Sequence, residues 1–265
     1  MAYNNWYITG DVHGVFTRFK HLHEKNIAVI ILGDCAVNWT FDYHDYEFKK
    51  SISNDYSNIT FYLVRGNHDG RPQKVLNIKT VYDDNVGNYV YMEYEFPNIR
   101  YFIDGSIYII ENHRILTIGG AYSVDKEYRL MKGAIWHPDE QLTAQEMREI
   151  ENKVFGENFD LVLTHTCPLS FMPIDLFLPG LDQSKVDKTM EYWLEDIKDK
   201  FGWNIWCAGH YHTDRVEAPY FEFYFNRIET LNLLFNRWKK YKKTKQLLYI
   251  NKSPNFYMYL DKNKQ

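Results

Sequence analysis

The chain has 265 residues and a mass of 31.9 kDa, with 45% hydrophobic and 25% charged residues, which is typical of a globular protein of one or two domains. Its formal net charge of −4 gives no general attraction to nucleic acid or to anionic membranes. No apolar run approaches the roughly 18 residues of a membrane span, and residues 1–5 carry no feature of a secretory signal. The three cysteines lack paired spacing, which favours a reducing compartment. We therefore expect a cytoplasmic protein.

The first 65 residues alternate between strand and helix patterns. Short apolar runs at residues 6–9, 28–32 and 59–64 predict strands, and the continuous β-branched run 28–32 predicts a strand that is buried on both faces. Residues 16–25 have apolar side chains at helical spacing, and residues 42–51 form a second predicted helix. This alternation is typical of parallel β-α-β units.

The middle of the chain is rich in short strands. Residues 89–96 alternate between apolar and polar side chains, which predicts an antiparallel strand. Further strands are predicted over residues 99–103, 107–110, 115–118, 161–163 and 205–208, and helices over residues 140–155 and 186–200. The pattern predicts an α/β sandwich whose polar turns gather at the carboxyl ends of the strands, where open α/β sheets bind their ligands.

The patterns weaken after about residue 218. Strands are predicted over residues 221–228 and 247–250, and the Lys-rich segment 238–246 is predicted to be an exposed helix or loop. Because no linker or repeat divides the chain, we expect a single domain over residues 1–265. Its core would cover about residues 5–218, and residues 219–265 would form a C-terminal extension.

Five turns that follow apolar runs carry side chains suited to metal binding. They contain Asp11 and His13, Asp34, Asn67 with His68, His165, and His210 with His212. Carboxylate, amide oxygen and imidazole together suit several divalent ions; we expect Mn first, with Fe, Zn, Co or Ni as alternatives. Two divalent ions about 3.5–4 Å apart can hold the attacking and leaving oxygens of an in-line displacement at phosphorus. The turns therefore predict a two-metal hydrolytic site.

In these turns the chain resembles the calcineurin-like metallophosphoesterase family, in particular its small bacterial and phage members. The family signature runs Asp-x-His, Gly-Asp, Gly-Asn-His-Asp/Glu, a single His and Gly-His-x-His, and all five blocks occur in this order within residues 5–215. The resemblance implies a four-layer α/β/β/α sandwich with its metal site at the carboxyl ends of the strands.

The resemblance also implies roles for individual residues. One metal would be held by Asp11, His13 and His212, the other by Asn67, His165 and His210, and Asp34 would bridge the two. A metal-bridging hydroxide would then attack phosphorus in line. His68 would stabilise the transition state or protonate the leaving oxygen.

The second block departs from the protein-phosphatase branch of the family. That branch continues Gly-Asp-x-x-Asp-Arg, whereas here Val37 and Asn38 follow Asp34, Cys35 and Ala36. Val37 cannot orient His68, so Asn38 or Asp69 would have to do so. The departure favours a small molecule or a nucleotide over a phosphoprotein as substrate.

Phosphate binding requires cationic or hydrogen-bonding partners. Arg65 and Arg71 flank the turn that contains His68, and Tyr122 and Lys126 belong to the Gly-rich segment 119–126, which could equally be an ordinary tight turn. With Asn38, these residues form the predicted substrate-binding set.

We predict a metal-dependent phosphatase or phosphodiesterase that hydrolyses a phosphate mono- or diester. One alternative is a nuclease acting on DNA or RNA, which the acidic balance disfavours. The other is a non-catalytic metal-binding scaffold, which the complete set of candidate ligands disfavours.

Overall fold

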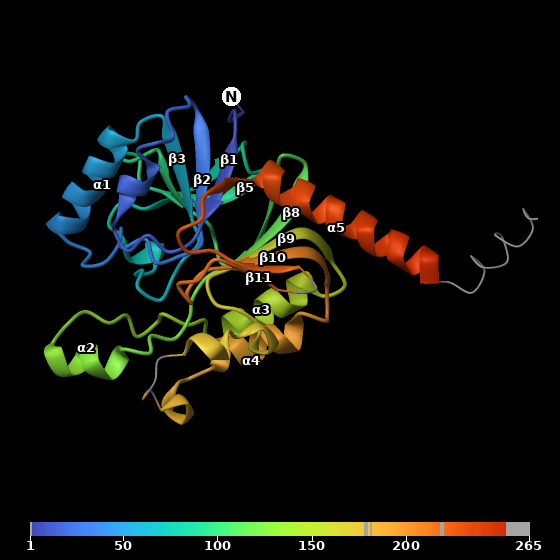
Figure 1. Cartoon of the computed structure of the whole chain (residues 1–265). Coiled ribbons are helices and arrows are strands. Elements are labelled where there is room, and N and C mark those ends of the chain that lie inside the picture. Colours follow the sequence, from blue (N-terminus) through green and yellow to red (C-terminus); the bar gives the residue numbers. More distant parts are fainter. Residues whose placement is uncertain (1, 178–179, 181, 218–219, 253–265) are drawn as a thin grey trace, which may run out of the picture.

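Two stacked β-sheets with helices on their outer faces form the protein (Figure 1). The computed structural model describes residues 2–177, 180, 182–217 and 220–252, with the side chains of 245–252 excepted. The α-helices are α1 (Tyr43–Asp55), α2 (Lys126–Lys132), α3 (Ala144–Val154), α4 (Thr189–Ile197) and α5 (Leu231–Lys252). Short 3-10 helices are η1 (Phe16–Phe19), η2 (Pro72–Lys74), η3 (Leu169–Phe171), η4 (Ile174–Leu176) and η5 (Gln183–Lys185).

The first sheet has seven strands and a parallel centre. In spatial order they are β13 (Glu229–Thr230), β1 (Trp6–Thr9), β2 (Ile27–Ile31), β3 (Ile59–Leu63), β6 (Ile99–Tyr101), β5 (Asn88–Met92) and β4 (Lys79–Asp83). Strands β1, β2, β3 and β6 are parallel to one another. Strands β13 and β5 pair with them in antiparallel direction, and β4 pairs antiparallel with β5. The predicted β-α-β connections therefore lie at the centre of this sheet.

The second sheet has six strands and the same plan. In spatial order they are β11 (Arg215–Glu217), β12 (Phe221–Phe223), β10 (Gly202–Ala208), β9 (Asn158–Thr164), β8 (His113–Ile118) and β7 (Ser106–Ile110). The four central strands are parallel, and β11 and β7 are antiparallel edges. The carboxyl ends of the parallel strands provide the turns that carry the predicted ligands.

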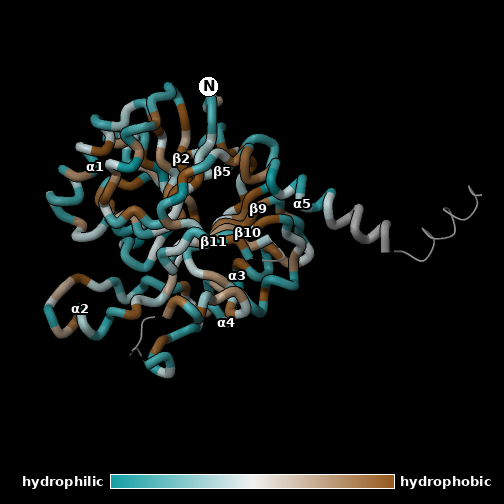
Figure 2. Tube along the Cα trace, in the orientation of Figure 1, coloured by the Kyte–Doolittle hydropathy of each residue, from teal (hydrophilic) through white to brown (hydrophobic). Residues whose placement is uncertain are grey.

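The side chains of β2 show how the layers are held together. Successive residues of a strand point to opposite faces. Ala28 and Ile30 pack in the core between the two sheets, whereas Val29 packs with Phe16 and Ile52 of the helical layer. On the far side, α3 and α4 cover the second sheet through a third apolar cluster, and Figure 2 shows the hydrophobic residues concentrated along the strands. The predicted four-layer α/β/β/α sandwich is confirmed.

Several predicted elements have other boundaries or another type. The helix expected over residues 16–25 is only the 3-10 helix η1, because a 3-10 turn also brings residues i and i+3, here Phe16 and Phe19, onto one face. Residues 247–250, expected as a strand, lie in α5. Strand β4 was not predicted, since it has one buried residue and therefore no apolar alternation. Helix α2 was not predicted either, because none of its residues is buried.

The C-terminal helix α5 is attached by its first turns. Leu231 and Leu234 are buried in the core between the sheets, and Arg237 forms ion pairs with Glu222 and Glu229. Trp238 and Tyr241 also pack against this core, and beyond them the helix extends away from the sheets (Figure 1). No helix in the described part of the chain is both long and apolar enough to cross a bilayer.

Candidate metal centre

Turns from both sheets meet at one edge of the sandwich. Asp11, Asp34 and Asn67 follow the parallel strands β1, β2 and β3, and His165 and His210 follow β9 and β10. Asp11, Asp34 and Asn67 are at most 3% exposed, and His165 is fully buried. Because carboxyl ends of parallel strands lie side by side, residues as far apart in the chain as Asp11 and His212 are in contact here.

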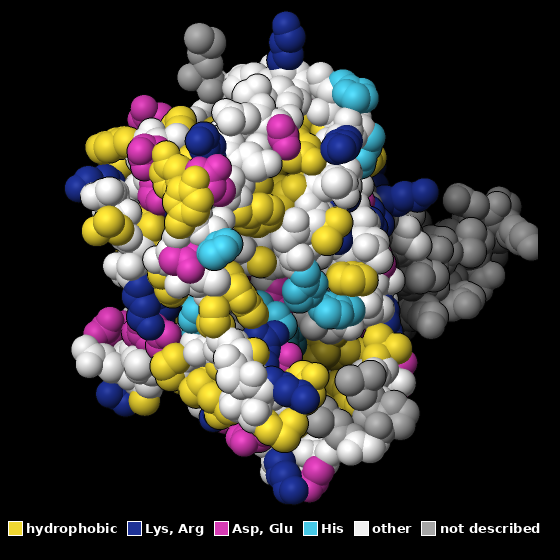
Figure 3. Space-filling view, turned by 90° about the vertical axis from the view of Figure 1, so that its left-hand side faces the viewer, with side chains coloured by type: hydrophobic (Ala, Val, Ile, Leu, Met, Phe, Trp, Pro, Cys, Tyr) yellow, Lys and Arg dark blue, Asp and Glu magenta, His cyan; other side chains and the backbone are white. Residues whose placement is uncertain are grey.

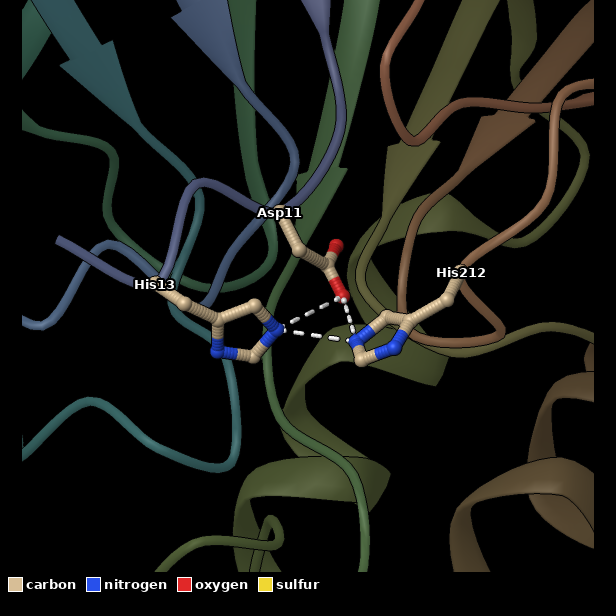
Figure 4. A group of neighbouring side chains, drawn as sticks. All are labelled: Asp11, His13 and His212. Atoms are coloured by element: carbon tan, nitrogen blue, oxygen red, sulfur yellow. Dashed lines mark hydrogen bonds and ion pairs between the residues drawn. The ribbon is translucent and has the colours of Figure 1, made fainter. Parts of the chain in front are cut away.

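One group of side chains consists of Asp11, His13 and His212, which point toward a common point (Figure 4). The Nε2 atoms of the two histidines lie 2.8 Å apart. Asp11 Oδ2 lies 3.4 Å from His212 Nε2 and 3.9 Å from His13 Nε2. Two imidazole nitrogens and a carboxylate oxygen so arranged can bind one divalent cation.

A second group surrounds His165. Its Nε2 lies 2.8 Å from Asn67 Oδ1 and 3.4 Å from Asp34 Oδ1, and its ring centroid lies 5.0 Å from that of His210. The other oxygen of Asp34, Oδ2, lies 4.0 Å from His13 Nε2 in the first group. Asp34 therefore stands between the two groups, with one carboxylate oxygen toward each.

The turns that carry these side chains have unusual backbone conformations and approach one another closely. His13, Asp34, His210 and His212 have positive φ angles of 44°, 51°, 67° and 49°, a conformation that is costly for non-glycine residues and clusters at functional sites. A Cβ atom on Gly66 would lie 2.1 Å from Asp34 Oδ1. Only glycine therefore allows these two turns to approach so closely.

The charge states of these groups fit cation binding. Burial, and next the nearby His165, lower the pKa of His210 to about 3, and burial also lowers the pKa of His165. Both imidazoles are therefore neutral, which is the form that binds metals. Burial, and next the charges of Asp11 and Asp69, raise the pKa of Asp34 well above its usual value. A divalent cation would relieve this repulsion, so the donor set fits metal binding.

The carboxylate of Asp11 behaves differently. Burial alone would raise its pKa, but its contact with His212, the charge of His165 and the backbone N–H of His210 outweigh burial and lower it. The backbone N–H of His210 lies 3.0 Å from Asp11 Oδ1. Asp11 is thus held as a carboxylate at the site.

The family model for calcineurin-like phosphoesterases matches residues 6–214. The chain belongs to this family. The matched range includes all the predicted ligands, from Asp11 to His212, and ends before α5. No curated protein matches the chain.

Calcineurin-like phosphoesterases use divalent metals, and His68 lies beside the groups that would hold them. Its backbone N–H donates to Asp34 Oδ1 over 2.8 Å, and its ring centroid lies 5.4 Å from that of His13. The ring is held by Arg129, whose Nη2 lies 3.0 Å from both ring nitrogens. Arg129 is in turn fixed by Asp125, at 2.7 Å, and lies over the ring of Trp39.

This arrangement corrects the expectation that Asn38 or Asp69 orients His68. Asn38 Oδ1 accepts hydrogen bonds from Lys49 and Tyr101. The carboxylate of Asp69 accepts from the backbone N–H groups of residues 35, 36 and 66, so it braces the turns. Arg129 could not be predicted from the sequence, because α2 carries no motif and Arg129 lies 61 positions from His68.

The predicted phosphate-binding arginines have structural contacts. Arg65 is 4% exposed and donates to Asp104 and to the carbonyl of Glu140. Arg71 forms ion pairs with Asp139 and Glu146. Within the described residues these contacts join the turn after β3 to Asp104 and to the start of α3. Arg65, Arg71 and Asn38 therefore have structural partners, and their role as substrate contacts stays a prediction.

The remaining predicted contacts lie nearer the site. Tyr122 lines a hollow of about 480 Å³ that is also bounded by His210 and His212. Lys126 Nζ lies 4.4 Å from the ring centroid of Trp136 and 5.8 Å from that of Tyr122. Figure 3 shows histidine side chains gathered at a hollow, with hydrophobic side chains next to them. Tyr122 is therefore the predicted substrate contact that the geometry favours most.

Proposed function

We propose that the protein is a phosphoesterase that uses two divalent cations. Asp11, His13 and His212 would hold one cation, Asn67, His165 and His210 the other, and Asp34 both. The observation that carries this proposal is the position of Asp34, with Oδ1 3.4 Å from His165 Nε2 and Oδ2 4.0 Å from His13 Nε2. We propose Mn²⁺ as the first ion to test, although the mixed donor set also accepts Fe, Zn, Co or Ni.

Bound cations would polarise the phosphoryl group and activate the attacking water. Residues of the chain would provide a hydrogen-bond donor and a cation for the phosphate oxygens. Burial, and next the charge of Arg129, lower the pKa of His68 to about 2, so its imidazole is neutral and can donate one N–H to an oxygen that gains charge. Arg129 places a guanidinium beside this ring, where it can bind an equatorial phosphate oxygen.

We propose a small phosphate ester or a nucleotide as substrate rather than a phosphoprotein. The second block lacks the Asp-Arg continuation of the protein phosphatases, and Arg129 supplies the guanidinium from a different element, α2. Neither observation distinguishes a monoester from a diester, so both classes belong in the test.

The test is hydrolysis of p-nitrophenyl phosphate and bis(p-nitrophenyl) phosphate by the full chain with Mn²⁺. We expect turnover of at least one ester, and a loss of about 1000-fold or more in Asp34→Asn and His165→Ala, since each removes a shared or buried ligand. His44→Ala is the control, because the side chain of His44 is 85% exposed. Full activity in Asp34→Asn, or no turnover by folded wild type with any of the five metals, would contradict the proposal.

A further inference from the structure

The hollow beside the metal centre is large enough for part of a substrate. It encloses about 480 Å³, within the range of about 300–1,000 Å³ of small-molecule pockets. His210, Tyr211 and His212 line it, so the turn that supplies two candidate metal ligands is also a wall of the hollow. A phosphate ester bound at the metals would therefore have its alcohol part next to this hollow.

Most of the remaining lining is apolar. Val124 and Leu176 border the hollow and are nevertheless 44% and 46% exposed. Figure 3 shows hydrophobic side chains next to the histidines. Apolar surface that is open to water in a pocket gains free energy when an apolar group covers it. The apolar side chains that line the hollow beside the turn are Tyr122, Val124, Met172, Leu176, Phe177 and Val186.

Two charged residues of the lining are held by other parts of the chain. Lys188 Nζ donates to the carbonyl of Gln183 over 2.6 Å. The carboxylate of Asp187 accepts from the backbone N–H and the hydroxyl of Thr189. A polar ligand would have to compete with these hydrogen bonds, whereas an apolar ligand would leave them intact.

A buried carboxyl group keeps one aromatic wall in position. Glu191 is 4% exposed and accepts from the hydroxyl of Thr166. That hydroxyl lies 3.2 Å from the hydroxyl of Tyr211, so the polar end of Tyr211 is turned toward the interior. Glu191 therefore supports the wall and is not a ligand contact, and Tyr211 contributes its ring to the hollow.

We propose that the hollow binds the alcohol part of the phosphate ester, and that this alcohol is hydrophobic, either an aliphatic chain or an apolar ring. The proposal rests on the proposed function and adds a substrate class to it. Among small phosphate esters it disfavours nucleotides, because their sugar places polar hydroxyl groups next to the phosphate.

A series of n-alkyl phosphates tests this proposal with the full chain and Mn²⁺. Methyl, butyl and hexyl phosphate release similar alkoxides, so differences in rate report contacts of the alcohol with the protein. We expect kcat/KM to rise about two- to fourfold for each added methylene until the hollow is filled. 2-Phenylethyl phosphate, compared with ethyl phosphate, shows whether a ring is accepted as well. Each ester is assayed as the monoester and as its methyl diester, and the released alcohol is measured by chromatography.

A matched pair separates apolar contact from chain length. n-Hexyl phosphate and 4-methoxybutyl phosphate have the same length and the same leaving oxygen, but the second carries an ether oxygen near its far end. We expect kcat/KM to favour n-hexyl phosphate about fivefold or more, because the ether oxygen would lose its water in an apolar hollow. Equal values, or a kcat/KM for adenosine 5′-monophosphate above that of n-hexyl phosphate, would overturn the proposal.

Variants assign this preference to the hollow. Leu176→Asn keeps the size of the side chain but makes the wall polar, and it should lower the preference for n-hexyl phosphate about threefold or more. Ile174→Asn is the matched control, because Ile174 begins the same 3-10 helix, is 74% exposed and lies outside the described lining; it should leave the preference unchanged. Val186→Thr, with an expected loss of about twofold, serves if Leu176→Asn does not fold. An unchanged preference in the folded wall variants would overturn the assignment.

Failure of this inference can be told apart from failure of the proposed function. Hydrolysis that does not depend on chain length would overturn the hydrophobic class and leave the phosphoesterase standing. If no ester is hydrolysed, the phosphoesterase proposal fails, and calorimetric titration of n-hexyl and 4-methoxybutyl phosphate into the full chain with Mn²⁺ tests the hollow alone. A dissociation constant about fivefold lower for n-hexyl phosphate would support the hollow as its site, whereas equal constants or no binding would overturn it.

Discussion

Two regions of the molecule meet at the candidate active site, and they are built differently. We call the turns that carry the predicted metal ligands the metal edge, and α2 together with residues 169–177 and 182–191 the rim. At the metal edge Asp11 and His165 are fully buried, and the backbone is held in strained conformations. In the rim, α2 has no buried residue, and Leu176 is 46% exposed.

Under the proposed function, the metal edge would carry out the reaction and the rim would determine substrate specificity. The metal edge supplies ligands from strand ends that belong to the two sheets, so its geometry depends on the whole fold. The rim supplies Arg129, which holds His68, and Leu176 and Val186, which line the hollow. The rim can therefore change during evolution without disturbing the metal ligands, as loops on a rigid scaffold commonly do.

Among substitutions outside the predicted ligands, the largest effect is expected from a methyl group placed at the metal edge. Gly66→Ala would bring a Cβ atom to 2.1 Å from Asp34 Oδ1, and displacement of a catalytic group by about 1 Å can cost 100-fold in rate. We expect kcat/KM for a chromogenic ester to fall about 100-fold or more. Gly156→Ala is the control for backbone strain alone, because Gly156 has a φ of +73° but nothing lies within 4 Å of its Cβ position. An equal kinetic loss in this control would show that the Gly66→Ala loss does not come from the contact with Asp34.

A smaller loss is expected from the rim at Arg129. Arg129→Met should lower kcat/KM about 10- to 100-fold, because a charged donor beside the reacting phosphate is lost. Arg129→Lys should recover part of the loss, since lysine keeps the charge but not the planar fork. Lys132→Met, on the same helix, should have no effect. Unchanged kinetics in Arg129→Met would mean that Arg129 has no part in the reaction.

The smallest effect on activity is expected at Arg71, which joins the turn after β3 to the start of α3. Arg71→Met should lower the free energy of unfolding by about 1–2 kcal/mol, a discounted value because the pair with Glu146 is partly exposed. The value of kcat/KM should change less than about threefold, since Arg71 does not contact the metal edge in the described structure. Urea unfolding and steady-state kinetics measure the two quantities, and a tenfold kinetic loss without loss of stability would support Arg71 as a substrate contact.

The ion pair between Arg71 and Glu146 predicts that the free energy of unfolding depends on pH. Burial would raise the pKa of Glu146, but hydrogen bonds from Arg71 and Thr143 outweigh burial and lower it from 4.5 to about 2. The stabilisation is therefore complete above about pH 4.5 and is lost as the pH falls toward 2. The difference in unfolding free energy between wild type and Glu146→Gln should shrink over this interval, and a constant difference would contradict the assignment.

The metal edge could be predicted from the sequence because its residue types are unusual at strand ends. Asp34, Asn67 and His165 follow apolar strands, and packing alone does not explain them there. Residue types at strand ends do not indicate in which direction a neighbouring side chain points. Arg65 and Arg71 flank His68 in the chain, yet their guanidinium groups bind Asp104 and Glu146.

The rim could not be predicted for two physical reasons. Helix α2 buries no side chain, so it leaves no hydrophobic period in the sequence. Glu191 is one of several acidic residues in a helical segment. Its hydrogen bond from Thr166, which the sequence does not show, distinguishes it from the others. The helix expected over residues 16–25 failed for a related reason, since Phe16 and Phe19 have the same spacing in a 3-10 turn.

The most direct test of the central claim is the number of metal ions bound to the metal edge. Equilibrium dialysis of the full chain against Mn²⁺, followed by elemental analysis, should give about two ions per chain. Asp34→Asn should bind fewer at the same free Mn²⁺ concentration, because Asp34 faces both groups of ligands. One ion or none in folded wild type, or an unchanged number in Asp34→Asn, would contradict the account.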